Sequence, residues 1–332
     1  MRELSVLQAA REVPDRDFLI TPQETFCYAD VAERTRHAMA GLTRSGVALG
    51  ARVAISPDAN IDSIVWLLAL FELGCPAVLL HPRLSVRERE TIVDKVDPER
   101  VLDGPPPTGG SPDRVSANAV PEEQILAVVF SSGSGERARG ISLSRRAFIA
   151  SSEAHARNLG WLPSDRWLLA MPPAHVGGFS ILTRCLIARA AIVLANGSFD
   201  PGRTIRALES QRVSLLSVVP TMLHRLLEST TPRWEPSPSL RAVLVGGAQF
   251  PDSLRRRAAA RGVPAVGTYG LTEACSQVAT QRLTEVGKAG SGAPLFGIKV
   301  RIRGGEIQVA GPTMMNGYLD AEDDAAGWTE DG

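Results

Sequence analysis

Short apolar runs rich in β-branched residues alternate along this chain with segments of helical period, and this alternation limits the possible folds most strongly. Such runs are typical of buried strands in a parallel sheet covered by helices. The pattern therefore predicts α/β layers around a largely parallel sheet. The predicted strands cover 52–55, 77–80, 125–130, 167–171, 191–194, 215–219, 242–245 and 265–268; the predicted helices cover 30–45, 61–73, 145–159, 178–189, 200–211, 221–227 and 253–261.

Two segments interrupt this pattern. Prolines and glycines at 104–111 break both helices and strands, which predicts an exposed linker near 104–115. From about Gly287 the sequence changes to short strands separated by Gly and Pro, which indicates a small antiparallel barrel or sheet. We therefore expect an α/β core of two related subdomains over 1–286 and a small β-subdomain over 287–332.

Composition excludes several classes of protein. Lys plus Arg and Asp plus Glu number 36 each, so no net charge attracts nucleic acid or an anionic membrane. The four cysteines are far apart and form no CxxC pair, which argues against a disulfide framework or a zinc site. Neither a signal peptide nor a membrane span is evident. We expect a cytoplasmic protein that binds a small molecule, and the sequence also allows a homo-oligomer.

A candidate phosphate loop follows the predicted strand 125–130. The segment 125–140, ILAVVFSSGSGERARG, offers backbone N–H groups at glycines, the hydroxyls of Ser131, Ser132 and Ser134, and the guanidinium of Arg139. Together these groups could cradle a polyphosphate, although an ordinary solvated loop would have a similar composition. The segment does not match the Walker A pattern. It is similar to the phosphate-binding loop of the adenylate-forming superfamily, with departures at Gly135, Glu136, Ala138 and Arg139.

Two further segments carry the same resemblance. The sequences VLVGGA at 243–248 and VGTYGLTE at 266–273 each end a predicted strand, so their ends should meet at the carboxyl edge of a sheet, where α/β folds bind ligands. They resemble the GGA/E and YGxTE motifs of acyl-CoA synthetases. Segments 171–179, 213–227 and 305–319 resemble further stretches of that superfamily in the same order. The resemblance implies its N-terminal domain: two mostly parallel sheets flanked by helices, plus a small antiparallel β-barrel or sheet.

The resemblance also implies residue roles. Gly246, Gly247 and Ala248 would lie beside adenine, and Tyr269 would pack on its face. Thr272 would bond the α-phosphate, and Glu273 would hold Mg²⁺ bridging ATP oxygens. The catalytic set would be Thr272, Glu273, Arg139 and His175. The implied nucleotide set is Ser131, Ser132, Gly133, Ser134, Gly135, Gly246, Gly247, Ala248, Tyr269, Gly270 and Thr272.

Within the superfamily, YGLTEACSQVAT at 269–280 and GSGAPLFGIKVRI at 290–302 look similar to o-succinylbenzoate-CoA ligases of menaquinone biosynthesis. That likeness implies an acid-CoA ligase that uses ATP, Mg²⁺ and coenzyme A, with an acyl-adenylate intermediate. A carrier-protein phosphopantetheine is a second possible acyl acceptor. The implied acid pocket comprises His175, Gly178, Phe179, Ser217, Gly270, Leu271, Ser276 and Gln277.

Members of the superfamily also use a later aspartate motif, a hinge and a lysine-bearing C-terminal lid. We expect this chain to end before those parts and to turn over slowly alone. Two alternatives stay open: a ligase or carrier-loading adenylation domain for another aryl or fatty acid, and a catalytically degenerate nucleotide-binding homologue. A dinucleotide-binding oxidoreductase is disfavoured because no GxGxxG turn follows the first strand.

Overall fold

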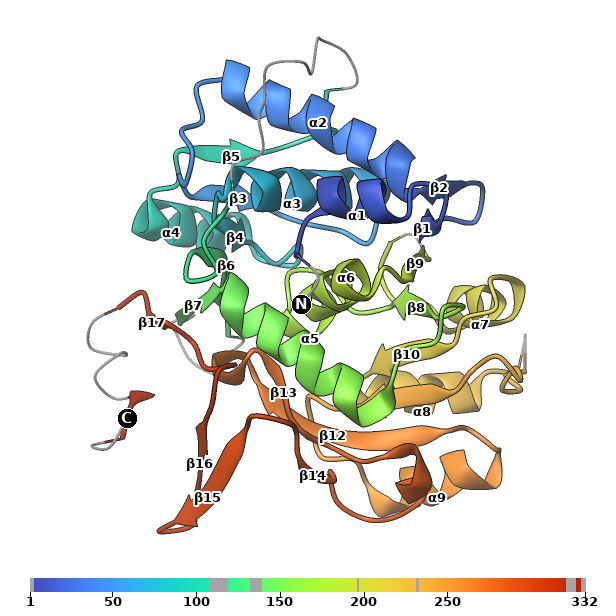
Figure 1. Ribbon diagram of the computed structural model, residues 1–332. Helices are drawn as coiled ribbons and strands as arrows, with labels where there is room; N and C mark the ends of the chain where they lie inside the picture. Colours follow the sequence, from blue (N-terminus) through green and yellow to red (C-terminus); the bar gives the residue numbers. More distant parts are fainter. Residues whose placement is uncertain are drawn as a thin grey trace.

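Two large, mostly parallel sheets organise the molecule (Figure 1). The computed structural model describes residues 3–107, 119–131, 139–195, 197–230, 233–320 and 327–329. Within this part of the chain, one sheet has the order β14-β13-β12-β11-β10-β8-β9-β1-β2 and the other the order β17-β7-β6-β4-β3-β5. The antiparallel strands β15 and β16 form a separate hairpin. The predicted fold class is therefore confirmed.

The first sheet contains strands β1 (Asp17–Ile20), β2 (Thr25–Cys27), β8 (Arg166–Leu169), β9 (Ala191–Leu194), β10 (Leu215–Val218), β11 (Ala242–Val245), β12 (Ala265–Leu271), β13 (Ser276–Thr280) and β14 (Ala293–Pro294). The second contains β3 (Val53–Ile55), β4 (Ala77–Leu79), β5 (Arg100–Leu102), β6 (Ile125–Phe130), β7 (Gly140–Ser144) and β17 (Gly317–Tyr318). The hairpin is β15 (Lys299–Arg303) with β16 (Glu306–Ala310).

The helices are α1 (Val6–Glu12), α2 (Tyr28–Arg44), α3 (Ile61–Leu73), α4 (Val86–Val96), α5 (Arg145–Leu159), α6 (Val176–Ala188), α7 (Pro201–Ser210), α8 (Pro220–Glu228) and α9 (Asp252–Ala260), with 3₁₀ turns η1 (Thr272–Ala274) and η2 (Leu283–Glu285). Helices α5 and α6 lie between the two sheets, as Figure 1 shows. Their apolar side chains join those of both sheets in the central core. Helices α7, α8 and α9 cover the outer face of the first sheet, and α4 covers that of the second.

All the predicted buried strands and helices are present, with ends shifted by a few residues. The prediction omitted α4, whose sequence VRERETIVDKV is mostly charged and whose buried face is narrow. It also stopped β12 short of Leu271, because the glycine at 270 interrupts the apolar run. After residue 287, β14 and β17 extend the two large sheets, whereas β15 and β16 pair with each other. The proposed division near 286 stays a prediction.

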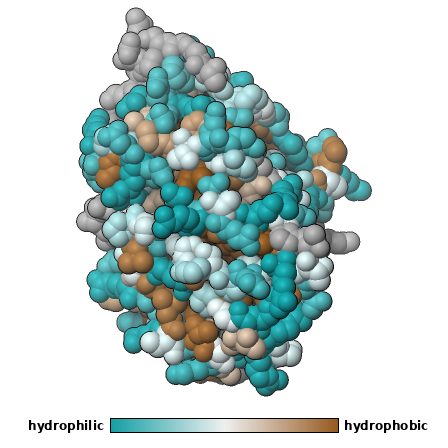
Figure 2. All heavy atoms as spheres, turned by 90° about the vertical axis from the view of Figure 1, so that its right-hand side faces the viewer, coloured by the Kyte–Doolittle hydropathy of each residue, from teal (hydrophilic) through white to brown (hydrophobic). Residues whose placement is uncertain are grey.

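The surface is predominantly polar on the face shown in Figure 2, where hydrophobic residues gather in small groups. Within the described residues, no helix is both long enough and apolar enough to cross a membrane. Part of the predicted linker, residues 108–115, lies outside the described residues.

Candidate active site

A cavity of about 740 Å³ lies where strands of both sheets end. Its walls come from the segments after β3, β4, β8, β9, β10, β11 and β12, from helices α6 and α8, and from the start of β13. The carboxyl ends of parallel strands are the usual ligand-binding edge of an α/β fold. The cavity brings together many of the predicted site residues: His175, Ser217, Gly246, Gly247, Gly270, Leu271, Thr272, Ser276 and Gln277.

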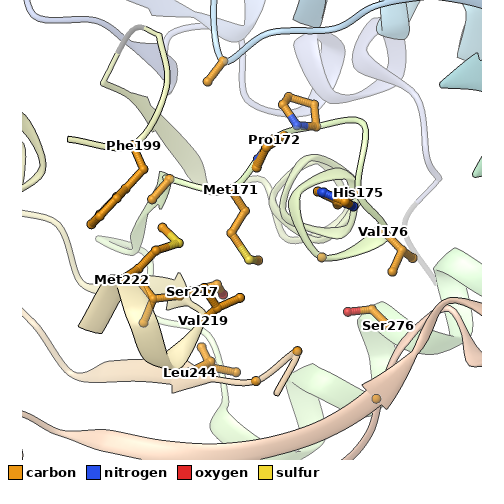
Figure 3. Close-up of a pocket in the computed structure, with 18 of the residues that line it drawn as sticks. Met171, Pro172, His175, Val176, Phe199, Ser217, Val219, Met222, Leu244 and Ser276 are labelled. Atoms are coloured by element: carbon orange, nitrogen blue, oxygen red, sulfur yellow. The ribbon is translucent and has the colours of Figure 1, made fainter. Parts of the chain in front are cut away.

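The cavity has an apolar side and a polar side (Figure 3). Phe199, Met222 and Met171 gather on one side, while His175 and the hydroxyl of Ser276 lie on the other. A volume of this size, lined by both apolar and polar side chains, is typical of sites for small organic ligands. The cavity can therefore hold a flat apolar group and still orient a polar one.

The glycine pair after β11 allows a close approach to the neighbouring strand. A Cβ atom at Gly246 would lie 2.6 Å from Cγ2 of Thr268, and Gly247 has a φ of 75°. A larger residue would collide at the first position and be strained at the second. Ala248 and Tyr269 do not line the cavity; the half-buried Tyr269 packs against an apolar cluster that includes Leu295. Their predicted contacts with adenine stay predictions.

Glu273 lies at the centre of a small polar cluster. Its carboxylate Oε1 accepts a hydrogen bond of 2.8 Å from the Tyr318 hydroxyl and lies 3.9 Å from Nη2 of Arg139. The Arg139 guanidinium also stands 5.0 Å from the centre of the Tyr318 ring. No role was predicted for Tyr318, although the GY pair at 317–318 belongs to a segment that carried the resemblance. The fold thus joins residues from three distant segments.

The base of the phosphate loop is described, whereas its tip is not. The Ser131 N–H donates to the Arg139 carbonyl over 3.1 Å, which closes the base of the loop. The buried Ser131 hydroxyl has no hydrogen-bond partner among the described residues, so a phosphate oxygen could fill that role. The predicted residues Ser132, Gly133, Ser134 and Gly135 lie outside the described residues.

A divalent cation fits the chemistry of Glu273. The described residues contain no group of three or more His, Cys, Asp or Glu side chains that could hold a metal. Mg²⁺ usually binds through one or two carboxylates and completes its shell with substrate phosphates and water. Glu273, beside the base of the phosphate loop, offers such a carboxylate. A cation there would depend on the nucleotide for further ligands.

His175 immediately precedes α6, and its ring faces that of a second histidine in the cavity wall. The His81 and His175 ring centres are 4.7 Å apart. Burial lowers the pKa of His175, and the neighbouring His81 and Arg83 lower it further. It is therefore neutral at pH 7 and can act as a hydrogen-bonding or packing group.

Two predicted acid-pocket residues lie in the core instead of the cavity. Phe179 is fully buried, and its ring packs against the rings of Phe71 and Phe148. A Cβ atom at Gly178 would lie 2.2 Å from the Pro172 carbonyl oxygen, so this glycine permits the tight start of α6. Both residues support the cavity wall from behind.

The hairpin of β12 and β13 forms the polar wall and depends on Gly270. A Cβ atom at Gly270 would lie 1.6 Å from the Ser276 carbonyl oxygen, so the close approach of the two strands requires glycine at this position. The missing side chain also leaves room for a ligand. The Gln277 amide is bonded within the protein: Nε2 donates to Thr280 and Thr268, and Oε1 contacts His155. Gln277 therefore braces the wall more than it presents polar atoms to a ligand.

Arg184 is a further cavity residue that the sequence did not reveal. It lies on α6, lines the cavity and is only 3% exposed. Its one hydrogen bond within the described residues runs from Nη2 to the Ser151 hydroxyl over 3.1 Å, and its Nε has no partner there. Burial lowers the pKa of Arg184 to about 10, so the guanidinium remains charged at pH 7. The available signal was that Arg184 is the one charged residue of the segment 176–188.

Comparisons with known proteins agree with this geometry. The family model described as AMP-binding enzyme matches residues 6–319. The 2-succinylbenzoate–CoA ligase of Bacillus pumilus is 30% identical over 98% of this chain and 74% of its own length. The o-succinylbenzoate coenzyme A synthetase of Bacillus subtilis, solved with ATP and magnesium ion, has a TM-score of 0.88 and 25% identity, covering 99% of this chain and 75% of that one. The same enzyme with its acyl-adenylate intermediate has a TM-score of 0.87 and 25% identity, covering 99% of this chain and 74% of that one.

Proposed function

Because the chain belongs to the AMP-binding enzyme family, we propose that it activates 2-succinylbenzoate with ATP and transfers the acyl group to coenzyme A. The acid has two carboxylates: one reacts, and the other remains charged in the bound adenylate. The observation that carries this proposal is Arg184, a buried cation on the cavity wall without an acidic partner in the described residues. A buried charge is costly unless it is paired, and a ligand carboxylate would pair it.

The remainder of the cavity suits the other parts of such an adenylate. The apolar side formed by Met171, Phe199 and Met222 offers contact to a flat ring. Gly246 and Gly247 bring backbone groups to the carboxyl edge, where we place the nucleotide. The family match, the named relative and the geometry of this site therefore all support the proposal that the chain is an acid-thiol ligase that forms AMP.

The reaction has two steps. First, a carboxylate oxygen of the acid attacks the α-phosphorus of ATP, the bond to the β-phosphate oxygen breaks, and pyrophosphate leaves. Second, the thiolate of coenzyme A attacks the acyl carbon, and AMP leaves with the bonding electrons. The carboxylate is already nucleophilic, so positioning and charge neutralisation dominate the first step.

The chain's own residues can meet those needs. The Thr272 hydroxyl lies at the cavity and could donate to the α-phosphate, and Arg139 adds positive charge at the base of the phosphate loop. Mg²⁺ bound at Glu273 would offset charge on the phosphate oxygens. The neutral His175 could orient the reacting carboxylate by a hydrogen bond.

Acid-dependent exchange of pyrophosphate into ATP tests the proposal. We expect exchange with 2-succinylbenzoate to exceed that with 4-oxo-4-phenylbutanoate, which lacks the ring carboxylate, and with fatty acids. Arg184→Met should lower the preference between the first two acids by about tenfold, the usual effect of losing a charged hydrogen bond. Equal exchange with both acids in the unmodified chain would refute the assignment of the substrate. Thioester formation with coenzyme A, compared with a phosphopantetheine carrier protein, identifies the acceptor.

A further inference from the structure

One face of α5 is bonded to the polar wall of the cavity. Ser151, His155 and Asn158 are spaced by four and three residues, so they share a face of the helix. The Ser151 hydroxyl donates to the Cys275 carbonyl over 3.0 Å, His155 Nδ1 lies 3.2 Å from Gln277 Oε1, and the Asn158 amide donates to the Thr280 and Gln281 carbonyls. This helix face thus holds the chain from 275 to 281 at successive points.

Ser151 makes two hydrogen bonds with one oxygen atom. While its hydroxyl donates to Cys275, the same oxygen accepts the hydrogen bond from Nη2 of Arg184. Ser151 is 2% exposed, so water does not readily replace either bond. The hydroxyl therefore links the buried cation of the cavity to the backbone of the polar wall at Cys275.

The backbone that Ser151 holds is strained. Cys275 has a φ of 53° and Ser276 a φ of 89°, values that residues other than glycine rarely adopt. Such residues persist only where the surrounding structure fixes them, and they concentrate at functional sites. Since Ser276 lines the cavity, the bond from Ser151 to Cys275 fixes the position of a residue that meets the ligand.

We propose that Ser151 is a positioning residue that selects acids carrying a second carboxylate. Its oxygen sets the direction of the Arg184 guanidinium, and its hydrogen fixes the wall that carries Ser276. Together they define the separation between the cation and the wall, and hence the place of the second carboxylate. The inference rests on the proposed role of Arg184 in substrate binding.

A selective loss of affinity should follow from Ser151→Ala. The guanidinium would lose its one hydrogen bond in the described part of the chain and keep only the looser contact with the Trp167 ring, so it could turn away. We expect the non-hydrolysable adenylate analogue of 2-succinylbenzoate to bind about tenfold more weakly, because hydrogen bonds to charged groups have about that effect. The corresponding analogue of 4-oxo-4-phenylbutanoate has no carboxylate for Arg184, so its affinity should change less than about twofold.

Ser152 provides a matched control for this substitution. It is the next residue of α5, is 3% exposed, and donates its hydroxyl to the Phe148 carbonyl of its own helix over 2.8 Å. Ser152→Ala therefore removes the same group at similar burial without touching Arg184 or the wall. It should leave the affinity ratio of the two analogues unchanged.

Calorimetric titration of both analogues into the unmodified chain, Ser151→Ala, Ser152→Ala and Arg184→Met tests the inference. We expect the affinity ratio to fall for Ser151→Ala and Arg184→Met alone. Two results would refute the role of Ser151 and leave the proposed function standing. In the first, Arg184→Met abolishes the difference in affinity between the two analogues while Ser151→Ala keeps it. In the second, Ser151→Ala lowers the affinity for both analogues equally. If the unmodified chain binds both analogues equally, the proposed function fails, and this inference fails with it.

Discussion

Replacing Arg184 by methionine should stabilise the folded chain while weakening its binding of the acid. Burial lowers the pKa of this guanidinium from its usual value to about 10. At about 1.4 kcal/mol for each pKa unit, keeping the charge in the folded state costs about 3 kcal/mol. The folded pKa is the lower one, so this cost is complete below pH 10 and declines only as the pH rises beyond that value. It therefore applies in full at pH 7.

Methionine has a similar length and no charge, so Arg184→Met removes that cost. The substitution also removes the hydrogen bond to Ser151, which offsets about 1 kcal/mol. We expect a net gain of about 2 kcal/mol in the free energy of unfolding, measured by urea denaturation at pH 7 with circular dichroism. Replacements of buried ionic groups by apolar ones often have this sign.

Arg145 gives a matched comparison with the opposite expected sign. It is also buried, but its Nη1 and Nη2 donate to the carbonyls of Phe71 and Leu4, and Glu72 lies close by. Arg145→Met would leave these groups without their partner and should cost about 3 kcal/mol. If Arg184→Met instead destabilises the chain by an amount similar to Arg145→Met, then the Arg184 guanidinium is satisfied within the protein, and the argument for a ligand carboxylate is refuted.

Three other substitutions test separate parts of the site. Gly270→Ala places a Cβ atom 1.6 Å from the Ser276 carbonyl oxygen, so the unfolding free energy should fall by about 3 kcal/mol or more; a normal urea midpoint would contradict this reading. Tyr318→Phe removes the 2.8 Å hydrogen bond to Glu273, so Mg-ATP should bind about tenfold more weakly in calorimetric titration. An unchanged affinity would show that this hydrogen bond plays no part in holding the cation. Burial lowers the pKa of His155 well below 6.5, so the contribution of the neutral imidazole to stability is complete above pH 6.5 and declines as the pH falls. His155→Asn keeps an amide donor but does not titrate, so the urea midpoint should fall less between pH 7 and pH 5 than in the unmodified chain. An equal fall in both chains would exclude His155 as the source of this pH dependence.

The sequence predicted the central strands well because a strand covered by helices on both faces is apolar throughout. The strand at 242–245 and the helix at 61–73 were predicted with their observed ends. Peripheral elements were missed because their burial is partial. Helix α4 is an example, although Ser85 and Glu88 form a capping box, which is a readable signal for the start of a helix.

The site was predictable where local sequence determines backbone geometry. The glycines at 246, 247 and 270 lie where side chains would collide or strain the backbone, and their motifs located the cavity edge. Phe179 was assigned to the acid pocket because the segment 171–179 resembles a pocket segment of the superfamily. Its ring instead packs in the core against Phe71 and Phe148, a tertiary contact that the local sequence does not reveal. Arg184 was missed because its access to the cavity depends on packing between the two sheets.

The layer between the sheets is where local rules of sequence are broken most clearly. A core helix would be expected to bury apolar side chains, but α5 and α6 also bury Ser151, His155 and Arg184. Each of these polar groups contacts either the strained wall or another group that does so. Proteins tolerate such departures from an apolar interior chiefly where function requires them. The stability lost at Arg184 and the specificity proposed for Ser151 therefore have one physical origin: this layer is the part of the core that reaches the cavity.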